Sequence, residues 1–162
     1  MPEKTTLTRA RQDKRAGKSP STQAGEFVRE EIEHIRHGKH GARSTKQAIA
    51  IGLSKARRAG VKLGAPKGAS ARTKTSAASA ARAGRTHRKP SRKRSRAMLA
   101  RLKHEGHGAV SHAALARQAK SSARRRGAAA RRRAARRAVR TKGPVARRAA
   151  ARKAAKTRQH RH

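Results

Sequence analysis

Large apolar side chains recur along residues 19–63 at the spacing expected of helices. In the first half of this segment the intervals are 4, 4 and 3 residues, which places one side chain per turn on a single helical face. Ser19 or Ser21 is a typical helix start, and Gly38 a typical helix end. The pattern predicts one helix whose apolar face is formed by Ala24, Val28, Ile32 and Ile35, with Phe27 beside it.

A second apolar stripe follows a short loop. Ser44 and Gln47 have the spacing of a capping box, and Gly60 is a suitable helix end. Between them Ile49, Leu53 and Ala56 share one helical face. We therefore predict a helical hairpin over residues 19–63. So few large side chains make a marginal core, which a homodimer or a bound partner would stabilise.

The stretch QAIAIGLSKAR, residues 47–57, has an alternative interpretation. Ala48, Gly52, Leu53 and Ser54 fit the A-x-x-x-G-[LV]-S turn of helix-turn-helix proteins. The helix after such a turn should bury a large apolar residue, yet arginines occupy that region, so we favour one continuous helix. In either case the segment offers a secondary basic surface of Lys46, Lys55, Arg57, Arg58 and Lys62.

The remainder of the chain lacks a sustained apolar pattern. Residues 1–18 are expected to be a flexible basic tail, residues 64–90 a flexible linker, and residues 91–162 an Arg/Ala-rich nucleic-acid-binding region. Within that region Ser111 is a candidate cap for a helix that ends near Gly127. Beyond it the octapeptides ARRAVRTK and ARKAAKTR repeat sixteen residues apart, at 135–142 and 151–158.

Composition adds an expectation of disorder. Alanine supplies 36 residues, whereas Leu, Ile, Val and Phe together supply 16, and the formal net charge is +40. Few bulky apolar residues combined with high net charge are typical of disordered chains, and neighbouring arginines repel one another along a helix. The predicted fold class is thus mostly α with extensive disorder, the tail becoming helical only when phosphates neutralise it.

The charge points to a polyanionic partner. Residues 66–162 carry 32 Lys and Arg against one acidic residue, and such a polycation binds DNA or RNA through release of counterions. A repeated Ala/Arg pattern does not specify bases, and Phe27 is the only aromatic residue available for base stacking. The candidate phosphate-binding residues are Arg92, Lys93, Arg94, Arg96, Arg124, Arg125, Arg126, Arg131, Arg132, Arg133, Arg136, Arg137, Arg140, Arg147, Arg148, Arg152, Lys153, Lys156 and Arg158.

Glu30, His34 and His37 fall at i, i+4 and i+7 of the first predicted helix, with His40 just beyond. This spacing suits zinc. It equally suits a solvated face in which Glu30–His34 and Glu33–His37 are ordinary i,i+4 pairs, and we favour that interpretation and predict no metal. The carboxylates would also repel phosphate, which predicts that this helix is kept off the nucleic acid.

Other chemistry is not indicated. The chain has no cysteine, no phosphate-loop spacing and no large core to hold catalytic groups in place, so we expect neither an enzyme nor a cofactor. No run of residues approaches the roughly 20 apolar residues of a membrane span, and the N-terminus has no apolar secretory segment. These features favour a cytoplasmic protein.

The stretch GEFVREEIEHIRHGKHGARSTKQAIAIGLSKARRAGVKLGAP resembles a bacterial family of small, basic, uncharacterised proteins, some of them described as DNA-binding. SHAALARQAKSSARRR resembles the C-terminal part of the same family, and the Ala/Arg-rich tail is similar in style to linker-histone tails and bacterial histone-like proteins. The resemblance implies a location on the bacterial nucleoid and brings no catalytic residues.

Together these features predict a non-enzymatic, sequence-tolerant DNA-binding protein of the histone-like, nucleoid-associated type. Two alternatives stay open at this point. One is an RNA- or ribosome-associated basic protein, since Arg-rich segments also fold on RNA. The other is an adaptor whose hairpin binds a protein partner while its tail holds nucleic acid.

Overall fold

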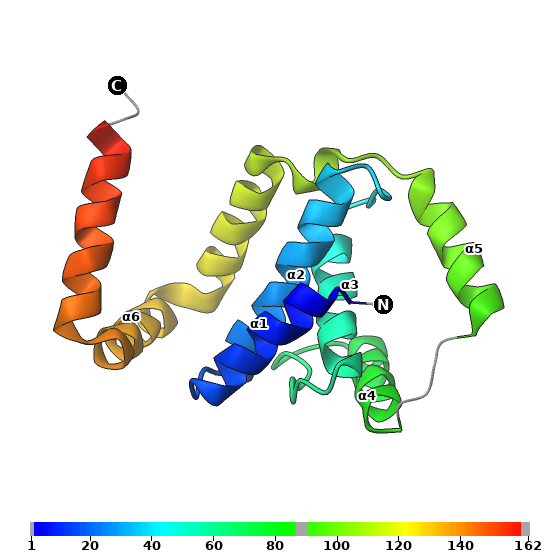
Figure 1. Cartoon of the computed structure of the whole chain (residues 1–162), viewed down its shortest axis with the longest axis horizontal. Coiled ribbons are helices and arrows are strands. Elements are labelled where there is room, and N and C mark those ends of the chain that lie inside the picture. Colours follow the sequence, from blue (N-terminus) through cyan, green and yellow to red (C-terminus); the bar gives the residue numbers. More distant parts are fainter. Residues whose placement is uncertain (1, 87–90, 160–162) are drawn as a thin grey trace. The chain divides into compact units, whose positions relative to one another are not determined.

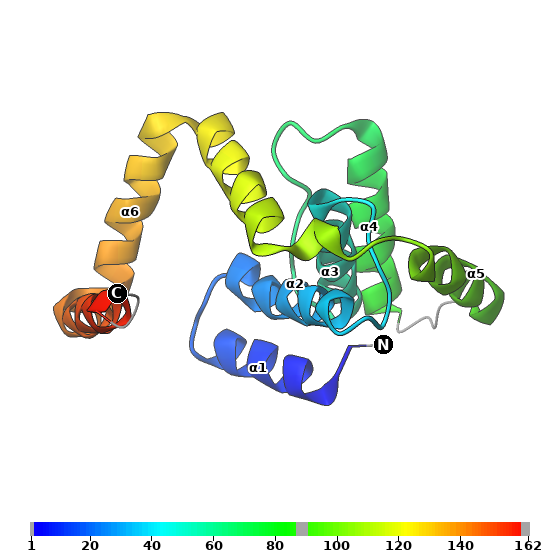
Figure 2. The same ribbon diagram turned by 90° about the horizontal axis from the view of Figure 1, so that it is seen from above.

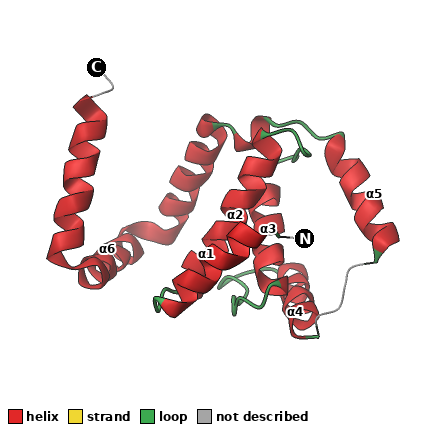
Figure 3. Ribbon diagram, in the orientation of Figure 1, coloured by secondary structure: helices red, strands yellow, loops and turns green. Residues whose placement is uncertain are grey.

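The protein is all-α in the residues that its computed structural model describes, 2–86 and 91–159 (Figure 3). Its elements are α1 (Lys4–Arg15), α2 (Pro20–Arg36), α3 (Thr45–Arg58), α4 (Ala71–Arg85), α5 (Arg92–Lys103), a 3-10 turn (Gly108–Val110) and α6 (His112–Gln159). The prediction of extensive disorder is therefore wrong. Helices occupy most of the described chain, including segments that carry hardly any large apolar side chain.

The chain divides into two compact units, Met1–Gln118 and Ala119–His162. In the first unit α2 and α3 pack against each other, α1 packs on α2, and α4 packs on α3 (Figures 1 and 2). The four helices therefore form a continuous packed group in which α2 and α3 are central.

Local capping explains where the two central helices begin. Ser19 precedes α2, its Oγ accepts the Thr22 amide, and Pro20 occupies the first turn. Ser44 Oγ likewise accepts the Gln47 amide at 3.2 Å, and the Gln47 side chain accepts the Arg43 amide at 3.0 Å. α3 then continues unbroken through residues 47–57, which supports the continuous helix and not the helix-turn-helix alternative.

Small residues explain the helices that the sequence pattern missed. α1 lies in the segment expected to be a flexible tail, where Ala10 is buried against the core. α4 lies in the segment expected to be a linker, and it buries Ala77, Ala80 and Gly84 while packing on α3. α4 is held by close contact of small side chains, and Leu7 is the only bulky apolar residue of α1, so neither helix has a stripe of bulky residues in the sequence.

Two buried clusters form the core of the first unit. One joins α1, α2 and α3 around Phe27, and comprises Ala10, Ala24, Phe27 and Ala56, flanked by Leu7, Leu53, Val61 and Leu63. The other comprises Ile35, Ala42, Ala48 and Val110, flanked by Ile32 and Ala109. Val110 thus brings the 3-10 turn onto the α2–α3 pair. There Thr45 Oγ1 donates to the Ala109 carbonyl at 2.6 Å.

Gly52 determines how closely α2 and α3 approach each other. A Cβ atom at this position would lie 2.7 Å from Val28 Cα and 3.0 Å from the Phe27 carbonyl oxygen. Backbone atoms cannot move aside as the end of a long side chain can. The close crossing of the two helices therefore requires glycine here, which is a packing role and not the turn role that the helix-turn-helix pattern would have given it.

α6 consists of three helical segments and not one rod. Gly127 (φ 73°, ψ 166°) and Gly143 (φ 67°, ψ 173°) leave helical geometry, and Pro144 opens the last segment. None of its described residues is buried. The expectation that the free tail is largely unfolded is thus wrong. Alanine, the best helix former, accounts for the helical state without tertiary packing.

Candidate nucleic-acid interface

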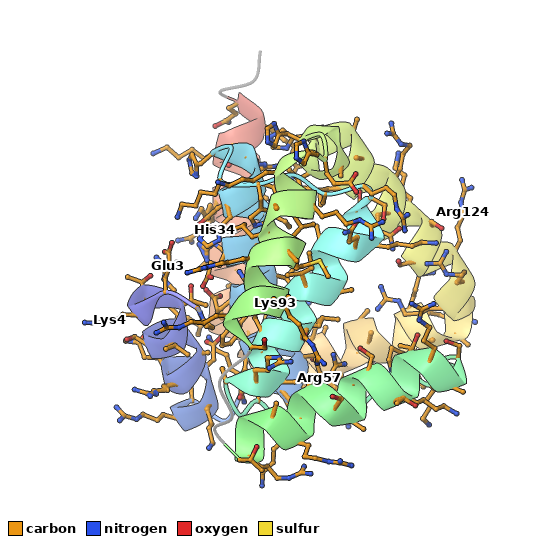
Figure 4. All side chains as sticks on the ribbon, turned by 90° about the vertical axis from the view of Figure 1, so that its right-hand side faces the viewer. Glu3, Lys4, His34, Arg57, Lys93 and Arg124 are labelled. Atoms are coloured by element: carbon orange, nitrogen blue, oxygen red, sulfur yellow. The ribbon has the colours of Figure 1, made fainter. Side chains whose placement is uncertain are left out.

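The basic residues predicted to bind phosphate are all exposed, from Arg92 on α5 to Arg158 near the end of α6. Lys93 and Arg124, labelled in Figure 4, are examples from the two helices. Intramolecular contacts engage few of their charges. Arg125 donates to the hydroxyls of Ser121 and Ser122, and Arg131 to the Gly127 carbonyl. Such contacts leave the guanidinium charge unneutralised and exposed to solvent.

The second and third segments of α6 carry the same arrangement of cations. The sixteen-residue repeat extends beyond the octapeptides, because it also aligns Arg131 with Arg147 and Arg132 with Arg148. At about 100° per residue, four aligned positions fall within roughly 140° of arc on each segment. They form what we call the cationic faces: Arg132, Arg136, Arg137 and Arg140 on one segment, and Arg148, Arg152, Lys153 and Lys156 on the other.

No carboxylate accompanies these faces. Residues 119–162 contain 18 Lys and Arg and no Asp or Glu. Ala134, Ala135 and Ala138 occupy the opposite side of the second segment, together with Arg131 and Lys142. The unit therefore has mutually repelling cations concentrated on one face of each segment and no internal counter-charge, an arrangement that an external polyanion would stabilise.

The secondary basic surface is not assembled as predicted. Lys46, Arg58 and Lys62 are exposed. The side chains of Lys55 and Arg57 instead form contacts within the fold. Arg57 is buried and donates from Nε to the Leu63 carbonyl at 2.9 Å and from a terminal nitrogen to the Gly64 carbonyl at 3.1 Å. These two hydrogen bonds hold the chain that follows α3 against Arg57. Arg57 itself lies close to α4 (Figure 4).

The side chain of Lys55 forms ion pairs with two glutamates of α2. Its Nζ lies 2.6 Å from Glu31 Oε2 and 3.5 Å from Glu30 Oε1. Both carboxylates are buried, with 3% of Glu30 and none of Glu31 exposed. The prediction of a solvated face that includes Glu30 and Glu33 is wrong for Glu30, whereas Glu33 is exposed and pairs with Arg29 at 3.5 Å.

Glu3, from the predicted flexible tail, completes this group. Its Oε1 lies 2.8 Å from Nε2 of His34 (Figure 4). The same oxygen lies 3.0 Å from Lys39 Nζ, and the Glu3 amide donates to Glu30 Oε2 at 3.1 Å. The hydrogen bond with His34, followed by that with Lys39, lowers the pKa of Glu3 to about 2. Periodicity could not have identified Glu3, because its partners are about thirty residues away.

The histidines are grouped differently from the predicted stripe. His34 keeps only a 4.0 Å contact with Glu30, and His37 is exposed at the end of α2. His40, in the following loop, is buried instead, and its Nε2 lies 3.4 Å from Glu31 Oε1. The predicted group was Glu30, His34 and His37. In the fold, His34 lies instead beside Glu31 and His40.

The described chain is an all-α basic protein with an acidic cluster inside its first unit and uncompensated cations along its second. Residues 11–67 match DUF6496, a family of unknown function. That match spans the segment of the resemblance noted above and ends before the α5 and α6 cations. No curated protein and no solved structure matches the chain. Within the described residues, no helix is both long and apolar enough to cross a membrane.

Proposed function

We propose that this protein is a non-enzymatic, sequence-tolerant DNA-binding protein of the histone-like type. The observation that carries the proposal is the repetition of one cationic face on two successive helical segments with no acid among residues 119–162. A fold that required its cations for internal salt bridges would place carboxylates beside them, as α2 does for Lys55.

Phosphate contact is the mode of binding that this arrangement supports. A helical segment of fifteen residues is about 22 Å long, and its cationic face would span several phosphates of a duplex. Arginine guanidinium groups bind phosphate oxygens in pairs, which accounts for the preference for arginine over lysine on these faces. Nothing in the repeated pattern distinguishes one base pair from another, so affinity should depend on the backbone.

The two glycine interruptions suit this mode of binding. At Gly127 and Gly143 the backbone adopts positive φ, which divides α6 into separate short helices. Short helices joined by glycine can follow a curved or irregular polyanion more readily than a single long rod. The basic helix α5, which belongs to the first unit, supplies further exposed cations.

Fluorescence anisotropy with a labelled duplex tests the proposal. If six to ten phosphates are contacted, affinity should fall by roughly 10³–10⁵ between 50 and 200 mM salt, and duplexes of unrelated sequence should bind equally. A salt-independent affinity would contradict phosphate binding, and a strong preference for one duplex would contradict sequence tolerance.

Competition by structured RNA then decides between the two polyanions. The proposal expects unlabelled duplex DNA to displace the labelled duplex at least as well as RNA of equal phosphate concentration does. Displacement only by RNA would replace DNA with RNA as the partner while leaving the phosphate contacts in place.

A further inference from the structure

Three potential metal ligands meet where α2 ends and the α2–α3 loop begins. One ring nitrogen each of His34 and His40 and one carboxylate oxygen of Glu31 all lie within 4.8 Å of one another. Glu31 is completely buried and 8% of His40 is exposed, so water does not fully solvate the group. We call these residues the Glu31–His34–His40 cluster.

The hydrogen bond at His40 determines which of its nitrogens is available. Nδ1 lies 3.1 Å from the Gly41 carbonyl oxygen. A carbonyl oxygen only accepts, so Nδ1 carries a proton, and in the neutral ring Nε2 then presents a lone pair. This Nε2 faces Glu31 Oε1 at 3.4 Å. Two lone pairs facing each other repel, and a metal ion bound by both atoms would remove that repulsion.

The oxygens of Glu31 are suited to such a cation. Both are buried. Oε2 pairs with Lys55 Nζ at 2.6 Å, whereas Oε1 accepts no hydrogen bond from the described residues. An unsatisfied buried acceptor costs about 1–3 kcal/mol. A ligand bond at Oε1 would remove that cost.

One of the three spacings already fits zinc. With metal–nitrogen and metal–oxygen distances of about 2.0–2.2 Å, neighbouring ligand atoms around a tetrahedral ion are about 3.4 Å apart. His40 Nε2 and Glu31 Oε1 already have this separation. The 2.8 Å contact between Glu3 Oε1 and His34 Nε2 leaves Nδ1 as the His34 nitrogen for the ion. Carboxylates commonly orient metal-binding histidines through the other ring nitrogen in this way.

From this geometry we propose that Glu31, His34 and His40 bind a divalent transition-metal ion of the zinc type. The ion would link α2 to the loop before α3, and through Glu3 to the chain entering α1. It would stabilise the first unit, far in sequence from the cationic faces of α6. The proposal is therefore independent of DNA binding and can fail or succeed without it.

Zinc titration of the full-length chain tests this, with calorimetry for stoichiometry and thermal unfolding for stability. We expect one ion per chain bound by the wild type, and a rise in Tm of roughly 10 °C when free zinc is about 100-fold above Kd. Mg²⁺ should produce no rise, because it prefers oxygen ligands. His40→Ala should abolish the zinc-dependent rise, whereas His37→Ala, an exposed histidine three residues away, should retain it.

Retention of the full rise in His40→Ala, or no rise in the wild type, would overturn the proposal. If His40→Ala fails to fold, NMR of the histidine ring nitrogens in the wild type can identify the residues that bind zinc. Zinc should then shift the His34 and His40 signals. Shifts confined to His37 and the other histidines would show surface binding alone, and a persistent doubly protonated His40 ring in excess zinc would show that a proton occupies the position.

Discussion

The two units of this protein are both helical and both basic, yet their helices are held by different forces. In Met1–Gln118, helices pack through Phe27, Ile35, Val110 and many alanines, and all seven acidic residues lie in this unit. In Ala119–His162 no described residue of α6 is buried, and no acid is present. The first unit depends on packing and internal ion pairs, whereas the second depends on the helix propensity of alanine.

The comparison shows that the number of cations does not define a binding surface. Lys55 and Arg57 contribute as much formal charge as any two arginines of α6, but the fold uses them to neutralise Glu31 and to hold the chain after α3. The cations of α6 lack such partners. Surface charge becomes available for a polyanion where the sequence provides no carboxylate to compete.

The largest effect should come from removing the second unit. A chain that ends at Gln118 loses 18 of 47 Lys and Arg and both cationic faces. We expect its affinity for duplex DNA at 100 mM salt to fall by roughly 10³-fold or more, since each lost phosphate contact reduces counterion release. Anisotropy titration measures this. Unchanged affinity would show that α5 and the first unit are the true binding surface.

Breaking the internal ion pair should have the next largest effect, on stability and not on DNA affinity. Lys55→Met leaves the buried Glu31 carboxylate without its ammonium partner, and we expect a loss of about 3–5 kcal/mol in the free energy of unfolding of the first unit. Lys46→Met, on the same helix but exposed, is the matched control and should cost under about 0.5 kcal/mol. Urea denaturation followed by circular dichroism compares the two variants. Equal losses would mean that the pair has no special role.

Overpacking the α2–α3 crossing should come third. Gly52→Leu forces a side chain against the backbone of Val28, and we expect a loss of about 1–3 kcal/mol in the free energy of unfolding. Ala50→Leu introduces the same side chain at an exposed position of α3 and should be nearly neutral. Thermal unfolding distinguishes them, and a neutral Gly52→Leu would contradict the close crossing.

The smallest effect concerns the interruptions of α6. Gly127→Ala should join the first two segments of α6, because alanine disfavours positive φ. In a helix interior alanine is more favourable than glycine by about 1 kcal/mol. Gly143→Ala is the comparison, since the following Pro144 disfavours helical geometry at the residue before it. Far-UV circular dichroism should show a gain in helicity for Gly127→Ala and a smaller one for Gly143→Ala. A larger gain for Gly143→Ala would contradict this account.

Periodic residues and caps made part of the fold predictable. Ser19, Gly38 and Ser44 mark the ends of α2 and α3 because capping is local, and Gly127 marks an interruption for the same reason. α1 and α4 cannot be predicted from a bulky apolar stripe, because they bury mostly small residues. α6 is helical without buried residues, because the helix propensity of alanine outweighs the repulsion between its arginines.

The sequence by itself determined the charge of this protein, the absence of acids from residue 119 onward, the ends of α2 and α3, and the interruption at Gly127. These properties are local or summed along the chain. Only the tertiary structure decided that Lys55 and Arg57 turn inward, that Glu3 reaches His34, and that His40 rather than His37 joins Glu31. Each of these contacts depends on how α1, α2, α3 and their loops pack, and helical spacing alone carries no information about packing between elements.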